Sequence, residues 1–168
     1  MRDDVGQLLW VGFEGTRVPD ALRARLDAGE IGATILFKRN LELTVEGGAE
    51  LRQEVCDLGA LIALNRELHR AAPDGVPALI AVDQEGGLVQ RVRAPATQWP
   101  PMRAHDGFAP PDDESIAAEV GRALGDELRA LGFDIDFAPV LDVHTNPANP
   151  VIGDRAFGTE PEAVARRA

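Results

Sequence analysis

Residues 76–87 read Val-Pro-Ala-Leu-Ile-Ala-Val-Asp-Gln-Glu-Gly-Gly, an apolar run that stops abruptly at an acidic segment with two glycines. A near-continuous apolar run of this length is typical of a strand that is covered on both faces of a parallel sheet. Residues 31–37 form a second run of the same character, and longer amphipathic segments separate such runs along the chain. This alternation predicts an α/β fold built on a parallel sheet.

The spacing of apolar residues predicts the other elements. Leu22 and Leu26 lie four residues apart, with Pro19 suited to the first turn of their helix and Gly29 to its end. A period of three to four residues predicts two longer helices. The full expectation is strands over 7–13, 31–37, 76–82 and 133–143, helices over about 19–29, 49–71 and 115–131, a long loop over 93–111, and a helix that starts at Thr159 with a capping box to Glu162.

Composition limits the classes of function. The 168 residues carry a formal net charge of -11, which disfavours nucleic acid because its phosphate backbone is anionic. No apolar run approaches the roughly 18 residues that a membrane span needs, and the acidic N-terminus does not resemble a secretion signal. Cys56 lies in an apolar helical pattern and is expected to be a buried, inert thiol. The sequence therefore predicts a cytoplasmic protein that binds neither nucleic acid nor membrane.

Asp83 is the first candidate for a functional residue because it directly follows the strand over 76–82. Ligands of α/β proteins bind at the carboxyl ends of parallel strands, and Gly86 and Gly87 allow unusual backbone conformations or the close approach of a ligand. A carboxylate in this place is able to accept hydrogen bonds from two hydroxyls of one pyranose ring. A turn-capping role for Asp83 is the alternative, and the residues alone leave both open.

Arginines provide the next candidates. Arg91 and Arg93 follow Asp83, and Arg155 lies in a loop that we expect just beyond another strand end. Each arginine is either a solvated surface charge or an oriented donor to a ligand. Asp142 and His144 give too few ligands for a metal, and no cofactor is predicted. We expect a solvated or structural role for Asp134 and Asp136. His69 and His105 show no partner pattern and are expected to be surface residues.

Four ordered motifs carry a resemblance to a known family. They cover residues 35–40 (Ile-Leu-Phe-Lys-Arg-Asn), 81–91, 137–143 and 152–157 (Ile-Gly-Asp-Arg-Ala-Phe). In this order they resemble family 3 glycoside hydrolases, most closely the single-domain bacterial β-N-acetylhexosaminidases. The resemblance implies a (β/α)8-type barrel and hydrolysis with retention through a covalent intermediate on an Asp. By motif, Asp83 would hold sugar hydroxyls, and Arg91 and Arg155 would bind the terminal N-acetylglucosamine. Leu88 departs from the arginine that the family often has there.

The chain is expected to represent only part of such a barrel. A closed barrel needs eight strands and about 250 residues, more than this sequence provides. We therefore expect residues 1–168 to be the N-terminal half of one barrel domain, truncated within a helix after about residue 159. The family's Lys-His-Phe-Pro-Gly-His-Gly-like segment, acid/base loop and nucleophilic Asp have no counterpart here, so no catalytic residue is expected in this segment. The rest of the barrel or an oligomer partner would be needed.

Two alternatives to the β-N-acetylhexosaminidase interpretation remain. A β-glucosidase of the same family would carry the same motifs, because no group that binds the acetamido substituent is identifiable. A non-catalytic sugar-binding domain derived from a half barrel would explain the binding residues without the reacting ones.

Overall fold

A computed structural model describes residues 5–48, 52–108 and 112–168 of the chain. The chain divides into two units, each made of three separate segments of the sequence. Unit 1 comprises residues 1–83, 91–97 and 128–136, and unit 2 comprises residues 84–90, 98–127 and 137–168.

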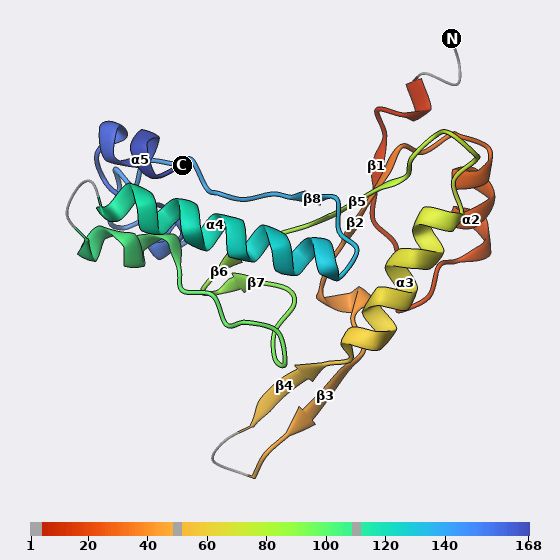
Figure 1. Cartoon of the computed structure of the whole chain (residues 1–168), viewed down its shortest axis with the longest axis horizontal. Coiled ribbons are helices and arrows are strands. Elements are labelled where there is room, and N and C mark those ends of the chain that lie inside the picture. The colour runs from red at the N-terminus through yellow and green to blue at the C-terminus, as the bar shows by residue number, and fades with distance from the viewer. Residues whose placement is uncertain (1–4, 49–51, 109–111) are drawn as a thin grey trace. The chain divides into compact units, whose positions relative to one another are not determined.

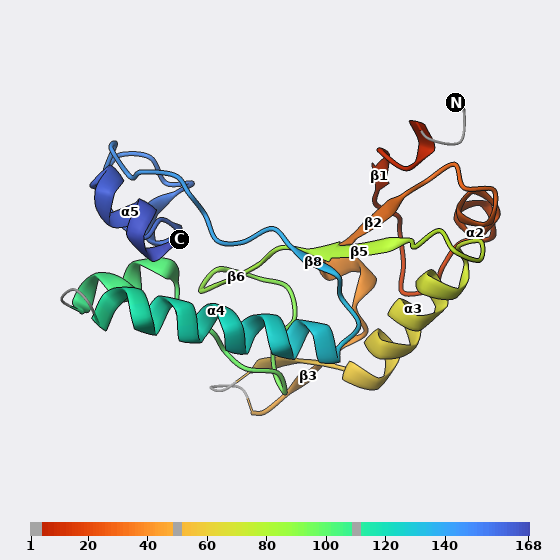
Figure 2. The same cartoon turned by 45° about the horizontal axis from the view of Figure 1, so that its top comes forward.

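A four-stranded parallel sheet forms the centre of unit 1. Its order is β1 (Trp10–Val11), β2 (Ala33–Leu36), β5 (Leu79–Val82) and β8 (Ile135–Asp136), and all neighbouring strands are parallel. Figure 2 shows these strands side by side. The predicted parallel α/β sheet is thus confirmed, although the strands are shorter than expected. The carboxyl ends of the strands lie at one edge of the sheet, as they must in a parallel arrangement.

Two helices of unit 1 bury apolar stripes. α2 (Asp20–Asp27) buries Leu22 and Leu26, as predicted, and Gly29 ends this segment with a φ of 67°. Pro19 is the N-cap residue and does not lie in the first turn. α3 (Leu58–Arg70) buries Leu61, Leu64, Asn65 and Leu68, and an ion pair between Arg23 and Glu67 joins α2 to α3.

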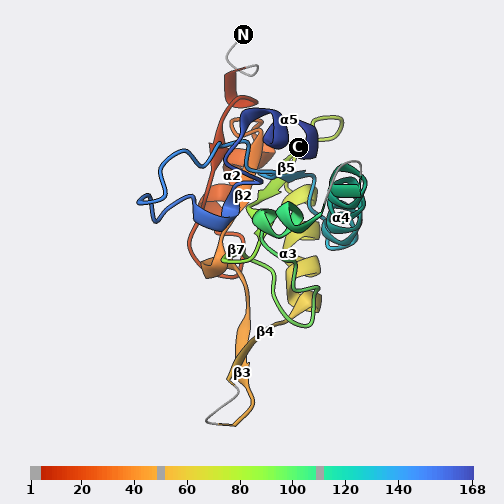
Figure 3. The ribbon, with the colours of Figure 1, turned by 90° about the vertical axis from the view of Figure 1, so that its left-hand side faces the viewer.

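The predicted helix over 49–71 is wrong in its first part. Residues 49–51 lie outside the described residues, and the next four form β4 (Gln53–Cys56), which pairs antiparallel with β3 (Leu43–Glu46). This hairpin projects from unit 1 (Figures 1 and 3) and follows the short helix η1 (Lys38–Asn40). Asp57 separates the hairpin from α3, because its side chain accepts a hydrogen bond from the Ala60 amide as an N-cap. The apolar residues across 51–62 are spaced three to four apart, which fits a helix, although Gln53–Cys56 is a strand.

Cys56 ends β4 and is 2% exposed, so the expected buried thiol is confirmed although the element is a strand. Its amide donates to the Ala94 carbonyl at 2.6 Å, which fixes the base of the hairpin. Burial, together with the nearby Asp57 carboxylate, raises the pKa of the Cys56 thiol to about 11. The thiolate needed for nucleophilic chemistry is therefore scarce at neutral pH.

The predicted strand over 133–143 is also too long, since only Ile135 and Asp136 pair with β5. Beyond them the chain passes into unit 2 without a ladder, and Pro139 has no amide to donate. Asp134 has the structural role that we expected: its Oδ2 accepts from the Ile80 amide and lies 2.8 Å from His69 Nε2.

Unit 2 contains short elements around an apolar cluster. They are β6 (Gln84–Gly86), β7 (Val89–Gln90), η2 (Met102–Gly107), most of α4 (Asp112–Ala130), η3 (Gly153–Arg155) and α5 (Pro161–Arg167). Met102, Ala117, Phe157 and Val164 pack together as its core. α4 confirms the predicted helix over 115–131 and starts three residues earlier, while η2 interrupts the predicted loop over 93–111, whose last three residues lie outside the described ones.

Two further expectations, for α5 and for His105, are wrong. The N-cap of α5 is Glu160 with Pro161 in the first turn, and no side chain caps the helix, so the capping box between Thr159 and Glu162 does not form. His105 is not a surface residue: it is 3% exposed and its ring lies 5.5 Å from that of Phe157.

Replacement of Asp57 tests the corrected start of α3. Asp57→Ala should lower the free energy of unfolding by about 1 kcal/mol, because the Ala60 amide loses its acceptor. Asp57→Ser retains a capping oxygen and should restore most of the loss. Urea denaturation measures both variants, and equal losses for alanine and serine would contradict the capping role.

His105 should make the stability of the protein depend on pH. Burial and the nearby Arg167 guanidinium hold the pKa of His105 below its ordinary value of 6.5. The unfolded chain therefore gains a proton as pH falls through 6.5 while the folded protein does not, so stability is present above this value and decreases below it. Denaturation between about pH 7 and about pH 5 should show a flatter profile for His105→Gln than for the wild type. The partly exposed His144→Gln is the control, and identical slopes for the wild type and His105→Gln would refute the assignment.

Candidate functional site

Asp83 lies where the sequence predicts it, directly after β5 at the carboxyl edge of the sheet. Arg91 Nη2 donates to Asp83 Oδ2 at 2.8 Å, and both side chains are partly exposed, at 28% and 22%. The structure therefore brings these two predicted site residues together. A charge-assisted hydrogen bond of this kind fixes the direction of both groups while part of each side chain remains in contact with solvent.

An aromatic ring supports Arg91 at the same edge. Phe37 follows β2, and the Arg91 guanidinium carbon lies 6.0 Å from the centre of its ring. Arg39 lies over the same ring at 4.6 Å, donates to the Phe13 carbonyl and pairs with Glu14. Stacking of this kind orients guanidinium groups and adds cation–π attraction. Residues 37–39 belong to one of the four family motifs, but the sequence alone predicts no role for them.

The glycines after Asp83 are required by close packing. Gly86 and Gly87 have φ values of 90° and 56° in the β6–β7 turn. A Cβ on Gly86 would lie 2.2 Å from the Pro100 carbonyl oxygen, and one on Gly87 would lie 2.8 Å from the Pro101 side chain. The expected special backbone conformation is confirmed. The close approach seen here is that of the protein's own Pro100 and Pro101, and the expected approach of a ligand stays a prediction.

Glu85 is a candidate that the sequence analysis missed. Its carboxylate accepts from Arg155 Nε at 2.7 Å and from Arg155 Nη2 at 2.8 Å, so the pair is bidentate. The Glu85 side chain is only 6% exposed, and that of Arg155 is 25% exposed. A buried acid signals a partner, but Arg155 lies 70 residues further on and no sequence pattern connects the two.

Arg155 itself lies in η3, behind a stretch of irregular chain, and does not follow a strand end as predicted. Its Nη1 donates to the Val151 carbonyl at 3.1 Å. Asp142 and His144 do not stand at a strand end either, because no strand forms over 137–143. Within the described segments, no three His, Cys, Asp or Glu side chains gather as a metal site would require, and no helix there is both long and apolar enough to cross a membrane.

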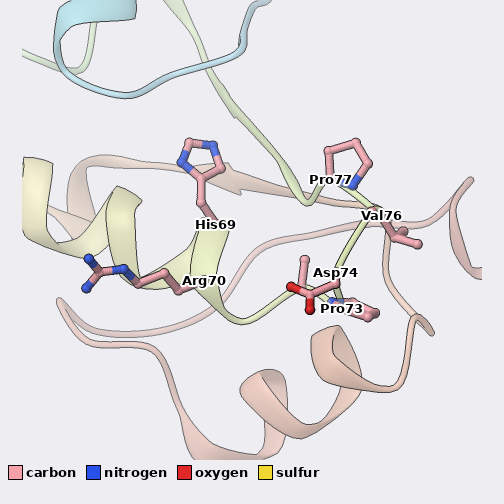
Figure 4. A pocket seen from close by; sticks show the side chains of 8 residues that line it. His69, Arg70, Pro73, Asp74, Val76 and Pro77 are labelled. Atoms are coloured by element: carbon pink, nitrogen blue, oxygen red, sulfur yellow. The ribbon is translucent and has the colours of Figure 1, made fainter.

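A pocket of about 530 Å³ lies in unit 1 at the loop between α3 and β5 (Figure 4). Residues 69–70 and 72–77 line it, including His69, Arg70 and Asp74. This loop leads into the amino end of β5, whereas Asp83 follows the carboxyl end. The pocket is therefore not part of the Asp83 site.

A parallel α/β sheet with an Asp–Arg pair directly after one of its central strands is typical of proteins that bind polar ligands at the carboxyl edge of the sheet. The family described as "Glycosyl hydrolase family 3 N terminal domain" matches residues 1–168. The chain belongs to glycosyl hydrolase family 3.

Curated relatives agree with this assignment. The chain is 41% identical over 159 residues to a "Beta-hexosaminidase" of Thiobacillus denitrificans, covering 93% of this chain and 40% of the relative. It is 37% identical over 163 residues to a "Beta-hexosaminidase" of Nitrosomonas eutropha, covering 95% and 42%. The chain thus spans about two fifths of the length of these relatives.

Solved structures show the same relation. NagZ from Neisseria gonorrhoeae, in complex with N-trifluoroacetyl-D-glucosamine, matches with a TM-score of 0.78 and 34% identity over 95% of this chain and 43% of that protein. A family 3 β-N-acetylglucosaminidase from Paenibacillus sp. matches with a TM-score of 0.82 and 36% identity over 99% and 29%. The expected fold class, the N-terminal half of a (β/α)8-type barrel, is confirmed, and the described residues do not form a closed barrel.

Proposed function

We propose that this chain is the N-terminal part of a single barrel domain in a glycoside hydrolase that removes terminal β-linked N-acetylglucosamine with retention of configuration. The observation that carries the proposal is the family match over residues 1–168. The relatives named above are β-hexosaminidases or a β-N-acetylglucosaminidase, which favours an N-acetylglucosaminide over a glucoside as substrate.

Asp83, Arg91 and Arg155 are the proposed substrate-binding residues. Asp83 accepts hydrogen bonds from sugar hydroxyls, while Arg91, supported by Phe37, holds the orientation of the Asp83 carboxylate and donates to the sugar. Arg155, which lies in η3 of unit 2, is proposed to donate to the substrate. Both arginines have a carboxylate partner that orients their donor groups, which suits hydrogen bonding to an uncharged polyol.

The reacting groups are proposed to lie outside residues 1–168. A retaining glycosidase needs a nucleophile about 5 Å from an acid/base group, on either side of the scissile bond. The carboxylates of Asp83 and Glu85 are each bound by an arginine, which suits a holding role. The remainder of the barrel supplies the nucleophile and the acid/base, and no cofactor takes part. The location of the enzyme in the cytoplasm stays a prediction from sequence.

Alanine substitutions in the complete gene product test the binding roles. Asp83→Ala and Arg155→Ala should each lower kcat/KM for an aryl N-acetyl-β-D-glucosaminide by about tenfold to a hundredfold, because each removes charge-assisted hydrogen bonds worth about 1.5–3 kcal/mol. Arg25→Ala removes an exposed ion pair with Glu30 and is the matched control. Unchanged kinetics in both site variants would reject the assigned roles, and faster hydrolysis of the matching aryl β-D-glucoside by the wild type would favour the β-glucosidase alternative.

The polypeptide of residues 1–168 should show no turnover of the aryl N-acetyl-β-D-glucosaminide. The physical reason is that the groups proposed to break the bond lie elsewhere. The measurement compares the release of the aryl alcohol with that of an unrelated protein. Hydrolysis well above this control would overturn the proposed division of roles, and a complete gene product that binds N-acetylglucosamine without hydrolysis would favour the non-catalytic alternative.

A further inference from the structure

We infer that Glu85 is a positioning residue that aims Arg155 at the sugar. The inference rests on the proposed function, because Arg155 is a sugar ligand only in that proposal. Glu85 itself is not assigned to substrate contact: its side chain is 6% exposed, and both of its carboxylate oxygens accept from Arg155.

The geometry of the pair favours positioning over a general gain in stability. Two parallel hydrogen bonds, at 2.7 and 2.8 Å, fix the plane of the guanidinium group and not merely its distance. A buried ion pair of this kind recovers the cost of desolvating both charges only in part, so stability alone explains it poorly. The two bonds from Arg155 to Glu85 instead hold the guanidinium group in one orientation.

The backbone around Glu85 is held firmly. β6 pairs with β7 on either side of Glu85, through Gln84 with Gln90 and Gly86 with Val89. The Gly87 amide donates to the Trp99 carbonyl at 2.9 Å, and the Trp99 amide donates to Gln90 Oε1 at 3.0 Å. Glu85 therefore projects from a short hairpin that is tied to the neighbouring loop.

Arg155, in contrast, lies in a segment with little regular structure. η3 contains three residues, and the chain before it forms no strand or α-helix from residue 137 onward. The Val151 carbonyl accepts from Arg155 Nη1 but lies four residues away in the same segment, so this bond does not tie the guanidinium group to another part of unit 2. Glu85 links the guanidinium group to a different and better fixed part of unit 2.

Glu85→Gln keeps the size of the side chain but not its hydrogen bonding. The amide oxygen still accepts one bond from Arg155, while the amide nitrogen faces the second guanidinium N–H as another donor. The arginine remains present and charged, but its plane is no longer fixed by two acceptors. If Glu85 acts through Arg155, substrate binding should weaken although no group that touches the sugar has changed.

The test uses steady-state kinetics of the complete gene product with an aryl N-acetyl-β-D-glucosaminide. Glu85→Gln should raise KM by about tenfold to a hundredfold, because the misdirected guanidinium group makes weaker charge-assisted hydrogen bonds to the sugar, while kcat changes by less than about threefold. Glu85→Asp keeps the charge but shortens the reach, and should lie between Glu85→Gln and the wild type. Glu114→Gln breaks a more exposed ion pair with Arg166 in the same unit and should leave both constants unchanged.

A double variant separates positioning from a structural role. In the Arg155→Ala background, Glu85→Gln should have no further effect on KM, because the residue through which it acts is gone. An additional loss there, or a wild-type KM in Glu85→Gln, overturns the inference. Melting temperatures of all variants show whether a lost activity comes from unfolding. A wild-type protein that neither binds nor cleaves the substrate would instead refute the proposed function, and this inference with it.

Discussion

The parallel pairing of β2 with β5 is the constraint on which the candidate site depends. Residues 33–36 pair in register with residues 79–82, so the two strands end side by side at the same edge. Phe37 directly follows β2 and Asp83 directly follows β5. The Arg91 guanidinium group lies near the Phe37 ring and pairs with the Asp83 carboxylate. A shift of one residue in this register would turn every side chain of one strand to the opposite face. The ladder thus determines which groups meet at the edge.

Sequence patterns located the central sheet and the residues at its edge. The apolar runs over 31–37 and 76–82 contain β2 and β5, and Asp83 was identified from its place after the second run. Local patterns were sufficient there because buried parallel strands have a distinctive composition and because function follows their carboxyl ends.

The sequence-based predictions were wrong where tertiary contacts determine the local structure or the burial of a residue. The β3–β4 hairpin interrupts a segment whose apolar spacing fits a helix equally well, and its pairing depends on contacts that spacing does not reveal. The buried state of His105 and the partnership of Glu85 with Arg155 depend on residues far away in the chain. A polar residue becomes buried when the fold provides a partner or a packing surface. A single sequence does not show which distant residues come into contact in the fold.

The paired arginines also bear on the kind of ligand. The chain has a formal net charge of -11, and the arginines near the proposed sugar each have an acidic partner. An unpaired arginine in a strongly acidic protein would be a site for anions, but a neutralised pair has directional hydrogen bonds and little net charge. Such a pair is suited to a neutral ligand rich in hydroxyls, which agrees with the family to which the chain belongs.

The two glycines after Glu85 limit how this part of the protein is able to evolve. Gly86 has no room for a Cβ beside the Pro100 carbonyl, and its φ of 90° disfavours other residues even without that contact. A side chain is therefore not accommodated at this glycine without a shift of the neighbouring backbone. Single substitutions that alter the preference for a ligand are therefore expected in segments with fewer steric constraints than these two glycines.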